Sequence, residues 1–300
     1  MERPGTYAVR IGTAAWLKEV MALFKLRLTS LVVVSAVLGY WMGVPAGQFS
    51  GVHALLLALA GMLVTGASNA LNQVLEVQAD SLMDRTATRP LVRGSLQGKE
   101  ATVIASVAGV LGVVLLWSVF GRLTAILGLL SLFMYVALYT PMKRSTPWAV
   151  FVGAFPGAFP PMMGYVAATG TFGLGPGLLF AMQFMWQFPH FWSIAWVLND
   201  DYAKAGYHLL PSRGGRDRYS AFLTLLYTLF LIPVGMLPWV FGLVGTWGMG
   251  TAVVLGLWML LQAVRLMITL DVKDARRLMF SSFLYLPLTQ LAYVLDKQLP

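Results

Sequence analysis

Long apolar runs constrain the fold of this chain more than any other feature of its sequence. A helix that crosses a bilayer needs ~20 consecutive apolar residues, and such runs recur along most of the chain. Apolar residues make up 58% of the 300 residues and charged residues only 11%, whereas soluble domains carry ~25% charged residues. We therefore predict an all-α membrane protein, with nine transmembrane helices in one bundle (25–300) behind a lead-in (1–24).

The nine predicted spans cover 28–44, 52–74, 101–120, 123–139, 148–168, 178–198, 219–240, 246–266 and 278–295. The fifth span contains three prolines, which remove helical hydrogen bonds and crowd the preceding turn. We expect them to break that span; they are Pro156, Pro160 and Pro161.

The basic residues predict how these spans are oriented. All Lys and Arg except Arg122 and Lys297 lie in or directly after the lead-in, or in or beside the loops that follow every second span. An excess of Lys and Arg marks cytoplasmic loops, so we expect a cytoplasmic N-terminus in a multi-pass protein of the cell inner membrane. The same distribution explains the net charge of +9 without nucleic acid as a partner. The absence of cysteine excludes disulfides, thiolate metal sites and a cysteine nucleophile.

Four oxygen-bearing side chains recur at every fourth position after the second span: Asn72, Glu76, Asp80 and Asp84. Four residues turn a helix by ~400°, which is only ~40° more than a full turn. Successive members of the set therefore lie almost above one another and would form one acidic stripe along the helix. Like charges at this spacing repel unless positive charge lies against them. Mg²⁺ prefers such oxygens and usually shares them with substrate phosphates. The stripe therefore predicts a Mg²⁺ site, and the alternative is a solvated helix face.

A second acidic segment, N-D-D-Y-A-K-A-G (199–206), follows the sixth span. Asp200, Asp201 and Lys204 can lie within one helical turn of one another. Alone, the segment would be a solvated helix end. On the same membrane face as the first stripe, it predicts the second half of a Mg²⁺–diphosphate clamp with its active site at the cytoplasmic face. A clamp at the mouth of an apolar bundle suits an amphiphile with a phosphate head and a hydrocarbon tail.

Basic residues near the two acidic segments are candidates for binding phosphate, because Arg grips phosphate oxygens bidentately and Lys acts as a point charge. The alternative is that these residues only set the topology. An ionisable side chain inside a span also indicates a functional site. His190 is such a residue, and it could ligate an iron, act as an acid or base, or hydrogen-bond to a neighbouring helix. The basic candidates are Arg89, Arg93, Lys143, Arg144 and Lys204.

Together these motifs resemble the UbiA-type intramembrane prenyltransferase superfamily over about residues 25–211. The resemblance is carried by N-Q-x-x-E-x-x-x-D-x-x-M-D-R-T-x-x-R-P-L (72–91), Y-T-P-M-K-R-S-T (139–146), G-A-F-P-P-M-M-G (157–164), and W-Q-F-P-H-F-W with D-D-Y-x-x-A-G. Quinone-directed relatives typically read N-D-x-x-D at the first motif. Gln73 and Glu76 stand at the two differing positions and favour the heme-directed branch, whereas the asparagine expected near Trp148 is absent.

The resemblance implies a nine-helix bundle in the lipid bilayer, with Mg²⁺ as cofactor and farnesyl diphosphate and heme B as substrates. Farnesyl diphosphate would ionise to an allylic cation and diphosphate, a heme vinyl group would capture the cation, and water would then add, giving heme O. The implied metal ligands are Asn72, Glu76, Asp80 and Asp84 at the first site, and Asp200 and Asp201 at the second. The implied diphosphate ligands are Arg89, Lys143, Arg144 and Lys204. Further substrate-binding candidates are Arg93, Tyr139, Gln187 and His190, with His190 placed toward the heme iron or a polar heme edge.

Two other functions stay open at this stage. One is prenyl transfer to a quinone precursor or to another aromatic or tetrapyrrole acceptor. The other is a cation-coupled transporter, although transporters place their charges near mid-membrane and these charges gather at one mouth. A homo-oligomer and a heme A-forming partner enzyme are the protein partners that the resemblance leaves open.

Overall fold

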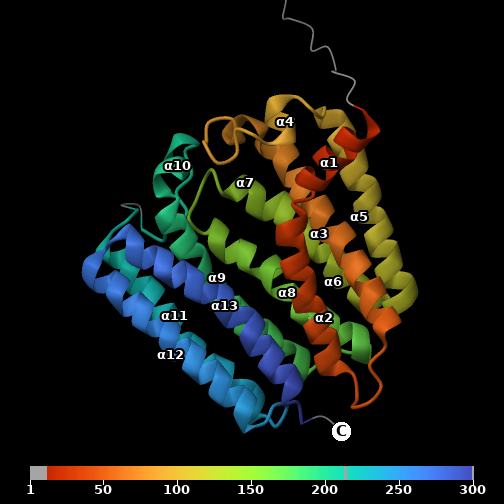
Figure 1. The fold of residues 1–300 in the computed structure, drawn as a ribbon, viewed down its shortest axis with the longest axis vertical. Coiled ribbons are helices and arrows are strands. Elements are labelled where there is room, and N and C mark those ends of the chain that lie inside the picture. Colours follow the sequence, from red (N-terminus) through yellow and green to blue (C-terminus); the bar gives the residue numbers. More distant parts are fainter. Residues whose placement is uncertain (1–11, 213–214, 299–300) are drawn as a thin grey trace, which may run out of the picture.

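The computed structural model describes residues 12–212 and 215–298, which form a bundle of helices (Figure 1). The elements in chain order are α1 (Thr13–Leu23), α2 (Leu26–Gly43), α3 (Gly51–Asp80), α4 (Pro90–Arg93), α5 (Gly98–Phe120), α6 (Arg122–Phe133), the π-helix η1 (Met134–Tyr139), α7 (Thr140–Met142), α8 (Ala149–Thr169), α9 (Leu174–Val197), α10 (Asn199–Lys204), α11 (Arg218–Val240), α12 (Thr246–Thr269) and α13 (Val272–Leu295).

Within the described ranges, eight segments are long and apolar enough to cross a membrane: α2, α3, α5, the α6–η1–α7 segment, α8, α11, α12 and α13. The predicted multi-pass, all-helical character therefore holds. The predicted nine spans differ from these eight by α9 alone. This helix has 24 residues, but it carries Gln183, Gln187 and His190. It packs against α8, α11 and α13, and a helix enclosed by other helices does not need an apolar surface for lipid.

Side-chain caps fix where several spans begin. The Ser50 hydroxyl accepts from the His53 amide before α3 (3.3 Å), and the Asp217 carboxylate accepts from the Ser220 amide before α11 (2.8 Å). Such caps satisfy backbone donors that have no partner in the first turn of a helix. The predicted spans agree with the helices to within a few residues at most ends. The largest differences are in α3, which continues past the expected end at residue 74 to Asp80, and in α13, which begins at Val272, before the expected start at residue 278.

The expected break at the prolines of the fifth span is wrong, because α8 runs without interruption through Pro156, Pro160 and Pro161. Proline at 161 cannot donate a hydrogen bond to the Gly157 carbonyl one turn earlier. The Gln183 side-chain amide from α9 donates to that carbonyl instead (2.7 Å). A neighbouring helix therefore satisfies the group that the proline leaves free, which is how membrane helices tolerate proline.

Close packing of α2 on α8 depends on two glycines. A Cβ atom on Gly164 would lie 1.8 Å from the Ala36 carbonyl oxygen, and one on Gly39 would lie 2.1 Å from the Pro161 carbonyl oxygen. Small residues allow helix backbones to approach in this way. Behind this contact, Ser35, Gln183 and Gln290 form a buried hydrogen-bonded cluster that joins α2, α9 and α13.

The short helices α1, α4 and α10 gather at one end of the bundle, at the top in Figure 1. The ends of α3 and α9 reach the same region, because α4 follows α3 and α10 follows α9. Ion pairs join the end of α3 to the α7–α8 loop through Glu76 and Lys143, and the loop after α3 to α10 through Asp84 and Lys204. Three polar segments that are far apart in sequence therefore meet at this end.

Candidate active site

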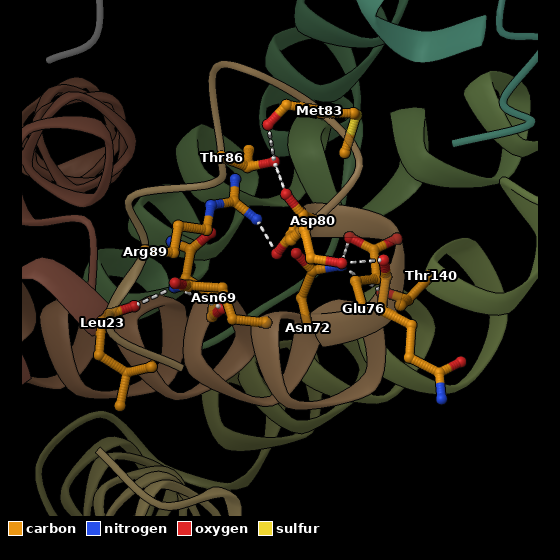
Figure 2. Close-up of polar contacts among 12 residues, drawn as sticks. Leu23, Asn69, Asn72, Glu76, Asp80, Met83, Thr86, Arg89 and Thr140 are labelled. Carbon is orange, nitrogen blue, oxygen red and sulfur yellow. Dashed lines mark hydrogen bonds and ion pairs between the residues drawn. The ribbon is translucent and has the colours of Figure 1, made fainter. Parts of the chain in front are cut away.

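The last turns of α3 present three oxygen-bearing side chains on one face: Asn72, Glu76 and Asp80, all at most 3% exposed. Asn72 Nδ2 donates to Glu76 Oε2 (2.9 Å) and to the Thr140 hydroxyl (3.0 Å), as Figure 2 shows. The Thr140 hydroxyl in turn donates to the Tyr135 carbonyl (2.8 Å) inside the π-helix. The π-turn, a feature that is frequent at functional sites, therefore sets the position of the threonine that orients Asn72.

Glu76 is the most heavily bonded group of the cluster. Lys143 Nζ lies 2.6 Å from its Oε1 and 2.8 Å from its Oε2, and the Tyr207 hydroxyl donates to Oε1 (3.0 Å). The same ammonium lies 4.9 Å from the centre of the Tyr139 ring and 5.7 Å from that of Tyr207. Burial lowers the pKa of Lys143, while the Glu76 carboxylate opposes this effect.

Asp80 ends α3 and has one oxygen without a partner. Its Oδ2 pairs with the Arg89 guanidinium, and its backbone carbonyl accepts from the Thr86 hydroxyl (2.7 Å) (Figure 2). Its Oδ1 is buried and has no hydrogen-bond partner among residues 12–212 and 215–298. Leaving a buried acceptor unsatisfied costs ~1–3 kcal/mol. An orphaned carboxylate oxygen beside two further oxygen donors therefore marks a position where a ligand can bind.

Asp84 does not belong to the stripe, which corrects the predicted helix. The helix ends at Asp80 with Ser81 as its C-cap, and the following loop buries Met83 at 2% exposure. Since Met83 turns inward, Asp84 points outward with 86% of its side chain exposed, and it pairs with Lys204 at 2.5 Å. The spacing of four residues carries no meaning once the helix has ended.

The second acidic segment does form a short helix, α10, but its two carboxylates diverge. Asp201 accepts from the backbone amides of Asp84 (2.8 Å) and Arg85 (3.4 Å) and lies 3.4 Å from Lys204. Burial opposes ionisation of Asp201, but these hydrogen bonds outweigh it and lower its pKa. Asp200 is 79% exposed and pairs with Arg216 at 3.0 Å.

Several other predicted residues lie outside the cluster. Arg93 pairs with Glu19 of α1 (2.8 Å). Gln187 is buried against Gly157 of α8. The Nδ1 atom of His190 lies 2.9 Å from the Ser282 hydroxyl of α13, and the His190 ring stacks on the Trp186 ring with 4.2 Å between the ring centres. Of the three roles open to His190, the structure displays the bond to a neighbouring helix, and the heme contact stays a prediction.

Sequence reasoning missed Lys25, which lies between α1 and α2. Its backbone φ of 49° is left-handed, a conformation that costs an L-residue ~1–2 kcal/mol. Burial, together with the charges of Arg89 and Lys143, lowers its pKa to about 7, while Asp80 and Glu76 act in the opposite direction. Within the described ranges Lys25 has no ion-pair partner. Its place directly before the first span made it look like a topological signal only.

Sequence reasoning also missed the contacts of two further residues, although Gln73 belongs to the first motif. Tyr207 follows the D-D-Y-x-x-A-G motif and reaches back to Glu76. Gln73 donates to the Leu23 carbonyl at the end of α1 (2.6 Å), so it holds the segment that carries Lys25 rather than lining the cluster. Both contacts depend on long-range folding that no local pattern encodes.

The donor set fits Mg²⁺ when substrate phosphates complete the shell. Among the described residues, no group of three His, Cys, Asp or Glu side chains could hold a metal ion on its own. Mg²⁺ is usually bound through one or two carboxylates, waters and substrate phosphates. Asn72, Glu76 and Asp80 offer such oxygens, with Asp80 Oδ1 free. The surrounding cations suit an anionic ligand beside them.

A family model described as the UbiA prenyltransferase family matches residues 32–286. The protoheme IX farnesyltransferase of Cytophaga hutchinsonii is 46% identical over 276 residues, which cover 92% of this chain and 96% of that protein. The protoheme IX farnesyltransferase of Christiangramia forsetii is 48% identical over 290 residues, which cover 95% of each chain.

Solved structures share the fold at lower identity. A structure of digeranylgeranylglyceryl phosphate synthase superposes with a TM-score of 0.77 at 16% identity, covering 93% of this chain and 98% of that one. A UbiA homologue from Archaeoglobus fulgidus, bound to GPP and Mg²⁺, superposes with a TM-score of 0.63 at 12% identity, covering 92% and 99%. At these identities the likeness concerns the fold alone.

Proposed function

This chain belongs to the UbiA prenyltransferase family, and from that membership we propose that it transfers a farnesyl group from farnesyl diphosphate to a vinyl group of heme B. The transfer leaves a carbocation at the former vinyl group, and a water molecule then adds to it and loses a proton, so that the products are heme O and diphosphate. Support comes from the names of relatives that are 46% and 48% identical over nearly the whole chain. The observation within the chain that carries the proposal is the buried Asn72–Glu76–Asp80 face, which has one free carboxylate oxygen and is surrounded by cations.

The donor diphosphate would bind where the ion pairs of α3 now lie. Arg89 and Lys143 neutralise Asp80 and Glu76 in the structure, and both can transfer their hydrogen bonds to phosphate oxygens. Mg²⁺, held by Asn72, Glu76 and Asp80, would supply the positive charge that stabilises the departing diphosphate. Asp201 and Lys204 hold the adjoining loop and would form the second side of the site.

The allylic cation must be kept from water and from competing nucleophiles. The three donors of α3 are almost fully buried, which excludes bulk water. Four tyrosine rings lie near this face of α3. The ring centres of Tyr135 and Tyr139 are 5.2 Å apart, and those of Tyr202 and Tyr207 are 6.3 Å apart. Aromatic faces attract a cation by ~0.5–2 kcal/mol each. Phe188 and Trp192 instead pack on Tyr227 of α11.

Product mass tests this function directly. Purified protein in lipid nanodiscs receives farnesyl diphosphate and Mg²⁺ with heme B or with 4-hydroxybenzoate. We expect a farnesylated porphyrin from heme B and no prenylated product from 4-hydroxybenzoate. The opposite pattern would assign the chain to the quinone-directed activity, and no product from either acceptor would contradict a prenyltransferase role for these substrates.

The position in the cell is part of the same proposal. We place the chain in the inner membrane with nine spans, including α9, and with its N-terminus and the α3–α10 end on the cytoplasmic side. The distribution of Lys and Arg supports this orientation. The length of α9 supports the ninth span, since 24 residues rise ~36 Å at 1.5 Å per residue.

A further inference from the structure

Beside the Asn72–Glu76–Asp80 face lies an open pocket of about 340 Å³. The resemblance implied Arg144, which lines this pocket, as a diphosphate ligand, whereas the site described above gives the diphosphate to Arg89 and Lys143. Small-molecule sites typically measure ~300–1,000 Å³. Lys143 lines both this pocket and the Asn72–Glu76–Asp80 face, but its ammonium is bound to Glu76. The pocket is lined by Lys143, Arg144, Ser145, Thr146, Pro147 and His208.

The chemistry of this lining fits a carboxylate. It contains an arginine, a histidine and two hydroxyl groups, and no acidic side chain. Arg144 and His208 are exposed, and neither forms an ion pair with another described residue, so they can meet a ligand without breaking one. A guanidinium binds a carboxylate through two parallel N–H···O bonds. The pocket therefore favours an anionic group at the solvent-facing edge of the site.

The pocket is also connected to the acidic cluster. Lys143 lines the pocket and pairs with Glu76 Oε1 (2.6 Å), and the Tyr207 hydroxyl donates to the same oxygen (3.0 Å). The residue that precedes the exposed arginine therefore contacts the buried carboxylate directly. The neighbouring residues Lys143 and Arg144 face different surroundings, because Lys143 is buried and Arg144 is exposed.

We propose that this pocket holds the propionate carboxylates of the porphyrin acceptor, with Arg144 and His208 as the residues that position the ring. The inference rests on the proposed function, because it takes heme as the acceptor. In heme B the propionates lie on the side of the ring opposite the vinyl groups. A ring held at this exposed pocket by its propionates directs its vinyl edge inward, toward Asn72, Glu76 and Asp80. Lys143 then serves the diphosphate and Arg144 the acceptor.

Binding of zinc protoporphyrin IX and of its dimethyl ester tests this assignment. The full chain is placed in nanodiscs of zwitterionic lipid, and the Kd for each porphyrin is measured by fluorescence titration. The pocket variants are Arg144→Gln and His208→Gln. The matched control is Arg276→Gln, an exposed arginine near the start of α13. Loss of one charge-assisted hydrogen bond should raise the Kd of the diacid by about tenfold.

The ester cannot form these ionic bonds, so its Kd should be alike in wild type, both pocket variants and the control. The KM for farnesyl diphosphate should rise less than the Kd of the diacid. Equal weakening of the diacid and the ester would overturn the inference, as would a raised KM for farnesyl diphosphate with an unchanged porphyrin Kd. Displacement of the diacid by added anionic phospholipid would assign the pocket to a lipid headgroup instead.

The mass assay of wild-type protein with heme B separates this inference from the proposed function. If farnesylated porphyrin forms while the pocket variants do not distinguish the diacid from its ester, the inference fails and the function stands. If no farnesylated porphyrin forms, the function fails and this inference fails with it.

Discussion

Asp80 and Asp200 are both carboxylates at the same end of the bundle, but their surroundings separate them. Asp80 is 1% exposed and retains a buried oxygen that has no partner in the part of the chain that the structure describes. Asp200 is largely exposed and is satisfied by Arg216. A residue that keeps an unsatisfied oxygen at such a cost is positioned for a ligand, whereas a solvated ion pair contributes little. The sequence, which shows only two acidic motifs, assigns both residues the same role.

Asp80→Asn should reduce the rate of farnesyl transfer roughly 10²–10³-fold, because the change removes a negative charge that would hold Mg²⁺, and Mg²⁺ would supply the positive charge that stabilises the leaving diphosphate. Asp200→Asn, which conserves shape in the same way, should change the rate by less than about threefold, since its exposed pair is worth little. Product mass over time at saturating Mg²⁺ measures both rates. Equal losses in the two variants would show that α10 turns Asp200 inward when substrate binds.

Because the pKa of Lys25 is lowered, we expect the protein to take up a proton at this side chain when diphosphate binds. Its pKa of about 7 lies below the ordinary value of 10.5, so the folded chain holds fewer protons than the unfolded chain between these pH values, and stability rises with pH in that window. At pH 8 the amine is ~90% neutral by this pKa. An anion that binds beside it restores the charged form, and the affinity should therefore fall as pH rises above 7.

Calorimetry in two buffers of different ionisation enthalpy counts these protons, with inorganic diphosphate and Mg²⁺ as the probe. The matched variant is Lys25→Arg, whose guanidinium stays charged. At pH 8 the wild type should take up ~0.9 proton more than the variant, and at pH 6 the two should agree. Equal uptake at pH 8 would mean that Lys25 is already charged without ligand, or that it does not face the anion.

At the scale of whole elements, apolar periodicity locates the helices but not their polar ends. The predicted spans match most helices closely, because lipid requires long apolar segments and leaves few alternatives. The extension of α3 to Asp80 and its end before Asp84 depend on Thr86, which bonds the last carbonyl. The π-turn at Met134–Tyr139 has no composition signal. The continuity of α8 depends on a glutamine of another helix, which local sequence cannot reveal.

Helix contact predicts how single glycines affect stability. Gly164→Ala would place a Cβ atom 1.8 Å from the Ala36 carbonyl oxygen and 2.7 Å from the Tyr40 amide nitrogen. Both atoms are backbone, so α2 and α8 must move apart, at a cost of about 3 kcal/mol or more. Gly177→Ala is the matched control on α9, because no atom of a described residue outside its own helical surroundings lies within 4 Å of the added Cβ.

The midpoint of thermal unfolding in detergent should fall clearly for Gly164→Ala. For Gly177→Ala it should stay the same or rise, because alanine favours the helix by up to ~1 kcal/mol over glycine. The reverse order would show that α2 and α8 are farther apart than the structure places them.

At the scale of the whole molecule, the eight described segments that are long and apolar enough to cross a membrane do not determine on which side each loop lies. Whether α9 also crosses decides between eight and nine spans. If α9 crosses, the loop before it and the helix α10 after it lie on opposite sides. This arrangement puts α10 on the same side as the Lys- and Arg-rich loops, together with Asp84 and Lys143. If α9 does not cross, every later loop changes sides. The distribution of Lys and Arg and the contacts of α10 with the α3 end would then place α10 on different sides of the membrane.

The chain has no cysteine, so single cysteines report on this topology without any background substitution. We expect Thr171→Cys, before α9, and Gln48→Cys, between α2 and α3, to react with a membrane-impermeant maleimide in intact right-side-out cells. Ala203→Cys, in α10, should react only after the membrane is opened. All three positions are exposed, so a lack of reaction reports the membrane rather than burial, and the unsubstituted chain gives the blank. Labelling of Ala203→Cys in intact cells together with Thr171→Cys would remove α9 as a span. Labelling of Ala203→Cys alone would place the Glu76–Asp80 end outside the cell, away from cytoplasmic farnesyl diphosphate.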